Sequence, residues 1–147
     1  MVKTIRELPF RELESIPQAI KDFLDQKISG FEDKVFSVEN FAAQISAKGK
    51  SFTVSQRALI QNAFKNQLSD FSLSDLQQKN IGNLSGENTF TVTTGHQLNL
   101  FSGPAFFIYK ILQTIKTCSF LKDHFPENEF VPVFWMASED HDFAEIN

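Results

Sequence analysis

The sequence contains a single cysteine, Cys118, so no disulfide can form within the chain. No apolar run approaches the roughly 20 residues that a membrane-spanning helix needs, and the charged first residues do not resemble the apolar segment of a signal peptide. Lysine and arginine gather in no stripe, and the formal net charge is −4, which argues against a nucleic-acid partner. The sequence therefore predicts a cytoplasmic protein that binds neither a membrane nor nucleic acid.

The composition is otherwise that of a globular protein. Hydrophobic residues make up 41% of the 147 residues and charged residues 22%, which is enough for one domain with a core. Cys118 follows Ile111 and Ile115 at the spacing of one helix face. This spacing predicts a packed, buried thiol and not a catalytic one.

Residues 1–88 are predicted to form a mainly helical region. Pro17 marks the start of a helix that Gly30 is expected to end. Thr53 and Gln56 have the spacing of a capping box, which predicts a further helix after Thr53. Two more helices are predicted in this region, namely 38–47, closed by Gly49, and Leu73–Lys79, closed by Gly82.

From residue 89 the pattern becomes that of a strand, a helix and a second strand. Residues 89–94 are β-branched and aromatic, which predicts a strand that Gly95 ends. A helix is expected over 104–122, then a loop with an exposed His124. The apolar run 130–136 predicts a second strand covered on both faces. The apolar stripe expected on the helix consists of Phe107, Ile108, Ile111, Leu112, Ile115 and Cys118.

The predicted fold class is therefore α/β, with a helical region at 1–88 and the start of a parallel-sheet core at 89–147. Two parallel strands do not make a complete doubly wound sheet. We accordingly expect the core to be truncated and the chain to be a fragment of a longer protein.

The first polar segment follows the first predicted strand. Gly95 would allow a tight turn, His96 could carry a proton or donate to a phosphate, and Gln97 offers donors and an acceptor. The helix start near Gly103 and Pro104 is a natural anion site. An ordinary loop with a glycine turn explains the segment equally well. The candidate binding residues here are Thr94, Gly95, Asn99, Ser102, Gly103 and Lys110, although a solvated lysine is the simpler interpretation of the last.

The second polar segment, residues 138–142, follows the second predicted strand. Three carboxylates around an imidazole could bind a divalent metal, orient an amine or act as a general base. Alternatively, Ser138 caps a helix and the acidic residues occupy its first turn. The carboxyl ends of parallel strands meet at one edge of a sheet, so the two segments are expected to share a crevice. The candidate catalytic residues are His96, Gln97, Glu139, Asp140, His141 and Asp142.

Together these motifs resemble the bacillithiol biosynthesis cysteine-adding enzymes, the BshC family of cysteine ligases. The resemblance covers about residues 90–147. It lies in Thr94-Gly95-His96-Gln97, Ser102-Gly103-Pro104 with Tyr109-Lys110, Val131-Pro132-Val133-Phe134-Trp135 and Ser138-Glu139-Asp140-His141-Asp142-Phe143. It implies a Rossmann-like core similar to that of class I aminoacyl-tRNA synthetases. The family usually has glutamine where His96 stands and threonine where Ser102 stands. The histidine makes the segment more similar to the His-containing nucleotide-binding signature of those synthetases.

The resemblance also implies a reaction, in which the carboxyl group of L-cysteine is joined to the amine of a glucosaminyl-malate. The product would be bacillithiol or a related low-molecular-weight thiol. Forming an amide from a free carboxylate is uphill in water, and ATP with Mg²⁺ would be the natural means of activation, although no motif establishes the cofactor. The family implies a homodimer joined by a C-terminal coiled coil, and residues 1–147 alone are expected to be inactive.

Two other classes of function compete with the ligase. A metal-dependent hydrolase or nucleotidyl transferase would use the acidic segment to hold Mg²⁺ or Zn²⁺. A non-catalytic module would bind a nucleotide or a partner without turnover. Loss of activity on chelation would favour the first, and tight binding without turnover would favour the second.

Overall fold

The computed structural model describes residues 8–97 and 103–138, and it divides the chain into two compact units, Met1–Ser46 and Ala47–Asn147. The helical elements are η1 (Phe10–Glu12), α1 (Gln18–Leu24), η2 (Glu32–Lys34), α2 (Val38–Ser51), α3 (Val54–Gln67), α4 (Asp75–Asn83) and α5 (Ala105–His124). The strands are β1 (Thr89–Gln97) and β2 (Glu129–Ala137). None of the helices in the described ranges combines the length and hydropathy that crossing a bilayer requires.

In the first unit, α1 begins after Pro17 as predicted but ends well before Gly30. Gln26 adopts a φ of 58°, and its amide donates to the carbonyl of Phe23 at 3.0 Å. The Lys27 amide donates to the carbonyl of Asp22 at 2.8 Å. These two bonds form a Schellman motif, which ends the helix with glutamine in the position that glycine usually takes. The prediction that Gly30 is the stop is therefore wrong.

The second unit begins with the end of α2 and continues through α3 and α4. The predicted capping box at α3 is confirmed, because the Thr53 hydroxyl accepts from the Gln56 amide and the Gln56 side chain accepts from the Thr53 amide. Ser74 and Gln77 form a second capping box at α4. Gly49 and Gly82 do not end their helices, contrary to prediction, because neither takes the left-handed conformation that a glycine stop requires.

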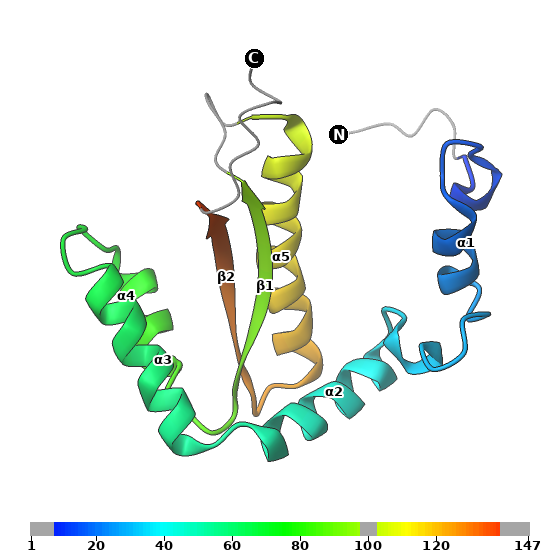
Figure 1. Ribbon diagram of the computed structural model, residues 1–147. Coiled ribbons are helices and arrows are strands. Elements are labelled where there is room, and N and C mark those ends of the chain that lie inside the picture. Colours follow the sequence, from blue (N-terminus) through cyan, green and yellow to red (C-terminus); the bar gives the residue numbers. More distant parts are fainter. Residues whose placement is uncertain (1–7, 98–102, 139–147) are drawn as a thin grey trace. The chain divides into compact units, whose positions relative to one another are not determined.

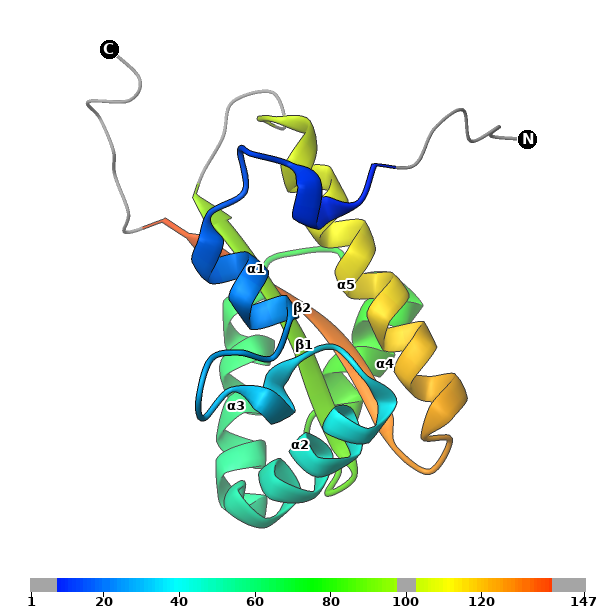
Figure 2. The same cartoon turned by 90° about the vertical axis from the view of Figure 1, so that its right-hand side faces the viewer.

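The predicted β-α-β unit is confirmed. β1 and β2 pair in parallel with a register that runs from Thr89 opposite Glu129 to Gln97 opposite Ala137. α5 connects the two strands and lies alongside both (Figure 1, Figure 2). The buried apolar residues are Ile81, Leu84, Cys118, Leu121, Phe130 and Val131. The fold is thus α/β, as expected.

The buried face of α5 differs from the predicted stripe. Cys118 is buried as expected, but Ile108, Leu112 and Ile115 are between 47% and 56% exposed. Their places are taken by Thr114 and Thr117, whose hydroxyls donate to carbonyls one turn back within α5 at 2.9 and 2.8 Å. The hydropathy pattern does not predict that these threonines are buried. They can be buried because their hydroxyls form hydrogen bonds within the helix. Burial raises the pKa of the Cys118 thiol to about 11, against a hydrogen bond from the Val92 backbone that lowers it, so the thiol stays protonated at neutral pH.

A buried arginine ties α3 to the start of β1. Arg57 is 5% exposed, and one guanidinium nitrogen donates to the carbonyls of Gly86 and Thr89 at 3.0 and 2.6 Å. The guanidinium also lies 5.5 Å from the Phe52 ring centre and 5.8 Å from that of Phe90. The aromatic faces offset part of the cost of removing the cation from water.

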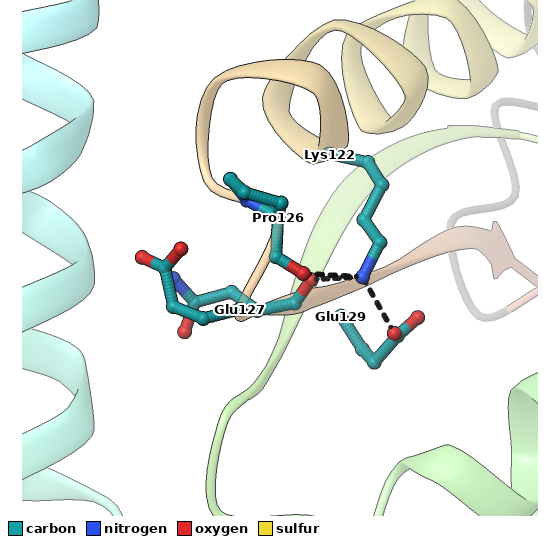
Figure 3. A network of polar contacts seen from close by, with 5 residues as sticks. Lys122, Pro126, Glu127 and Glu129 are labelled. Atoms are coloured by element: carbon teal, nitrogen blue, oxygen red, sulfur yellow. Dashed lines mark hydrogen bonds and ion pairs between the residues drawn. The ribbon is translucent and has the colours of Figure 1, made fainter.

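A lysine organises the turn between α5 and β2 (Figure 3). The Lys122 ammonium donates to the carbonyls of Pro126 and Asn128, each at 2.9 Å, and to the Glu129 carboxylate at 2.7 Å. The hydrogen bond from Lys122 holds the pKa of Glu129 below its ordinary value of 4.5. The Glu127 carboxylate points away from this ammonium in Figure 3.

Arg57→Met should lower the free energy of unfolding by roughly 2–3 kcal/mol, because two carbonyls lose a charged donor. Denaturant titration of the intact protein checks this change. Lys65→Met is the matched control, since Lys65 lies on the exposed side of the same helix and bonds only to Gln61 in the described ranges. Equal unfolding midpoints for the two variants would show that the arginine contacts contribute nothing.

The Glu129 carboxylate should make the protein less stable at acidic pH. Its pKa is lowered on folding, so the stabilisation is present above the ordinary pKa of 4.5 and is lost as pH falls through the folded value. Glu129→Gln should therefore flatten the acid-induced fall in melting temperature, measured between about pH 6 and pH 3. Glu127→Gln, the control, should follow the wild-type curve. A Glu129→Gln curve parallel to wild type would contradict the assigned role of Lys122.

Candidate functional site

β1 is longer than predicted and carries the first polar segment inside the sheet. Strand pairing continues through Gly95, His96 and Gln97, which lie opposite Trp135, Met136 and Ala137. Gly95 does not end the strand, so that prediction is wrong. Because Gln97 and Ala137 are paired at the last rung, the chain leaves both strands side by side at the same edge.

Gly95 is required by the close approach of β2. A Cβ atom built on Gly95 would lie 2.9 Å from the carbonyl oxygen of Trp135 and 3.0 Å from the Trp135 Cβ. Contacts this short are avoided in proteins, so the absence of a side chain lets the strands pair at this rung. The glycine therefore serves the sheet and not a turn.

His96 contacts two aromatic rings from the first turn of α5. Its ring centre is 5.1 Å from that of Phe106 and 5.6 Å from that of Phe107, the second at an interplanar angle of 90°. Nδ1 lies 3.1 Å from the carbonyl oxygen of Gln97. A carbonyl only accepts, so this contact is a hydrogen bond in the forms of the ring that carry a proton on Nδ1.

Lys110 bonds to the end of β1. Its ammonium donates to the carbonyl of Gly95 at 2.8 Å and lies 5.8 Å from the centre of the Phe106 ring. An ammonium has three donors, so this bond leaves Lys110 the capacity to hold an anion as well. Lys110 is exposed, in agreement with its interpretation as a solvated lysine, and it also bonds to the Gly95 carbonyl.

Sequence reasoning missed the structural partners of His96. Phe107 packs against Phe134 of β2 with ring centres 5.3 Å apart and planes at 82°, so it contacts residues of both strands. The sequence predicts Trp135 only as an apolar strand residue, whereas the structure places it opposite Gly95. The available signal is the aromatic pair that begins two residues after Pro104, where the chain enters the helix that packs on β1.

The remaining predicted residues divide into two groups. Thr94 is half-buried next to Gly95, and Gly103 is exposed with a φ of 61°, just before Pro104 at the N-cap of α5. Asn99, Ser102, Glu139, Asp140, His141 and Asp142 lie outside the described residues. In the ranges that are described, no group of His, Cys, Asp or Glu could hold a metal ion.

His124, expected in a loop, is the last residue of α5, and its Nδ1 contacts the Phe120 carbonyl at 2.8 Å.

Gly95→Ala should lower the free energy of unfolding by roughly 1–3 kcal/mol, because the added methyl must push β2 away. Gly82→Ala is the matched control. Nothing lies within 4 Å of a Cβ built on Gly82, which is inside α4, so alanine there should raise stability by roughly 0.5–1 kcal/mol. Denaturant titration compares the two variants, and changes of the same sign would contradict the strand-packing account.

Comparison with known proteins identifies the family. The sequence model described as "Bacillithiol biosynthesis BshC, N-terminal Rossmann-like domain" matches residues 4–147. A protein of Flavobacterium psychrophilum named "Putative cysteine ligase BshC" is 50% identical over 87% of this chain and 25% of its own length. Relatives with the same name from Flavobacterium johnsoniae and Staphylococcus saprophyticus are 48% and 33% identical over 87% and 86% of the chain. The chain spans about a quarter of the length of these relatives. It therefore belongs to the BshC family of bacillithiol biosynthesis and corresponds to the N-terminal Rossmann-like domain of that family.

Proposed function

We propose that the protein carrying this chain is a cysteine ligase that forms an amide bond between L-cysteine and a glucosaminyl-malate. The observation that carries the proposal is the 50% identity to a relative named as a cysteine ligase. The register of the sheet agrees with it, because the segments after Gln97 and Ala137 leave the strands at one edge. An edge of this kind is where open α/β sheets bind their ligands.

In the proposed reaction, the amine nitrogen attacks the activated carbonyl carbon of cysteine. A carbon–nitrogen bond forms, the leaving group departs with its electron pair, and the amine loses a proton. ATP with Mg²⁺ would supply the activation that a free carboxylate lacks. We assign the recognition of the nucleotide or another anionic substrate to Thr94, Gly95, Asn99, Ser102, Gly103 and Lys110, with the amino end of α5 as an additional source of N–H donors.

The catalytic roles proposed for the chain's own residues follow from their chemistry. His96 would donate from a protonated Nε2, and Gln97 from its side-chain amide, to the carboxylate or phosphate oxygens, where charge develops as the carbonyl is attacked. Glu139, Asp140, His141 and Asp142 would orient the amine and accept its proton. Gln97 and Ala137 pair at the last rung of the sheet, and Glu139 follows Ala137 by two residues in the sequence.

His96→Ala and Asp140→Asn in the full-length protein should each lower kcat/KM by roughly 100-fold or more, because each removes a group proposed to act on charge or a proton. The assay incubates L-cysteine and glucosaminyl-malate with and without ATP and Mg²⁺, and mass spectrometry measures the condensed thiol. His124→Ala is the matched control. It changes the other described histidine, at the far end of α5, and should keep wild-type turnover.

The outcomes separate the competing functions. Product that requires ATP supports the ligase and identifies the cofactor together. No product in any mixture, with the protein folded, would rule out this pair of substrates. Chelator-sensitive hydrolysis of a nucleotide without condensation would favour the metal-dependent alternative. Wild-type turnover in both site variants would overturn the residue assignment but not the reaction.

A further inference from the structure

We propose that Phe107 is a positioning residue for the reaction, which holds the His96 imidazole in one orientation and links it to β2. The inference rests on the proposed function, because it assumes that His96 takes part in the chemistry. It adds an aromatic residue of α5 to a site to which that helix otherwise contributes Lys110.

The first support is the geometry of the rings. Phe107 meets His96 at 90° and Phe134 at 82°, with ring centres 5.6 and 5.3 Å apart. Both are edge-to-face arrangements, which fix the angle as well as the distance between rings. One side chain therefore ties the orientation of a β1 imidazole to a residue of β2.

The second support is that the imidazole has further contacts besides Phe107. Phe106 contacts the His96 ring at 5.1 Å, and the Lys110 ammonium above Phe106 bonds to the Gly95 carbonyl. Nδ1 points to the carbonyl oxygen of Gln97. Rotation of the imidazole would break this bond and at least one ring contact, so the ring is restricted before any substrate arrives.

The difference in burial identifies Phe107 as the more important ring. Phe106 is 52% exposed, whereas Phe107 is half-buried and contacts both strands. A group that must meet a reacting atom within a few tenths of an ångström loses rate when its support is removed, even though the group itself remains. Phe107 thus affects the reaction through His96 and does not need to touch the substrate.

The test uses the full-length protein with ¹³C-labelled histidine. In Phe107→Leu, the Cε1–H resonance of His96, assigned by its absence in His96→Ala, should move because a neighbouring ring is lost. We expect kcat to fall by about 10- to 100-fold with KM little changed. Phe107→Tyr keeps the ring and should restore both the resonance and kcat.

The control is Phe120→Leu on the same helix. Phe120 lies 4.2 Å, centre to centre, from the ring of His124. This variant should therefore move the His124 resonance while leaving the His96 resonance and kcat at wild-type values. It makes the same chemical change beside a histidine that has no proposed role.

Two results would overturn the inference. A His96 resonance that does not move in Phe107→Leu excludes a positioning role, whether or not the ligase reaction is found. A loss of kcat that Phe107→Tyr fails to restore, with an unmoved resonance, would make Phe107 an ordinary packing residue. A moved resonance in a protein with no ligase activity would support the contact with His96 and refute only the proposed reaction.

Discussion

The parallel pairing of β1 with β2 is the constraint on which the rest of this structure depends. It sets the register that brings Gln97 beside Ala137, and it needs the strands close enough at Gly95 that no side chain fits there. A two-stranded sheet is marginal by itself in water. It persists here because α5 covers it with Thr114, Thr117, Cys118 and Leu121, all of them buried.

Cationic side chains satisfy backbone carbonyls around the ends of the strands. Arg57 bonds to two carbonyls at the start of β1, and Lys122 bonds to two in the turn before β2. Lys110 bonds to the Gly95 carbonyl near the opposite end of β1. A buried carbonyl without a hydrogen-bond donor costs free energy. These long side chains therefore stabilise backbone segments that the hydrogen bonds between the strands do not include. The cations at the amino ends are structural, whereas Lys110 lies beside the candidate site.

The sequence predicts most of the elements because their signals are local. Periodicity located the helices, the β-branched run located β1, and the Thr53 capping box was visible in four residues. The errors come from effects that depend on distant residues. The sequence predicts that Gly95 ends the strand, but the glycine continues it because Trp135 lies opposite and leaves no space for a side chain. The sequence also predicts Ile108 on the buried face of α5, where the structure has Thr114 and Thr117.

The candidate site is harder to predict for the same reason. The side-chain chemistry of His96 and Gln97 marks them as candidates in the sequence. Their position at the carboxyl end of β1 follows from the β-branched residues that precede them. The division into regions 1–88 and 89–147 stays a prediction, as do the roles of Glu139 to Asp142. The contacts of His96 with Phe106 and Phe107 depend on how α5 returns over β1, which no local pattern specifies.

The Gly95 rung also has a consequence for how this protein can evolve. The atom that a Cβ at position 95 would meet first is the backbone oxygen of residue 135, which every amino acid carries. No exchange of Trp135 for a smaller side chain can therefore make room for a larger residue at position 95. A substitution at position 95 therefore cannot be compensated by a substitution at position 135. Only a larger separation of the two strand backbones would accommodate a side chain there.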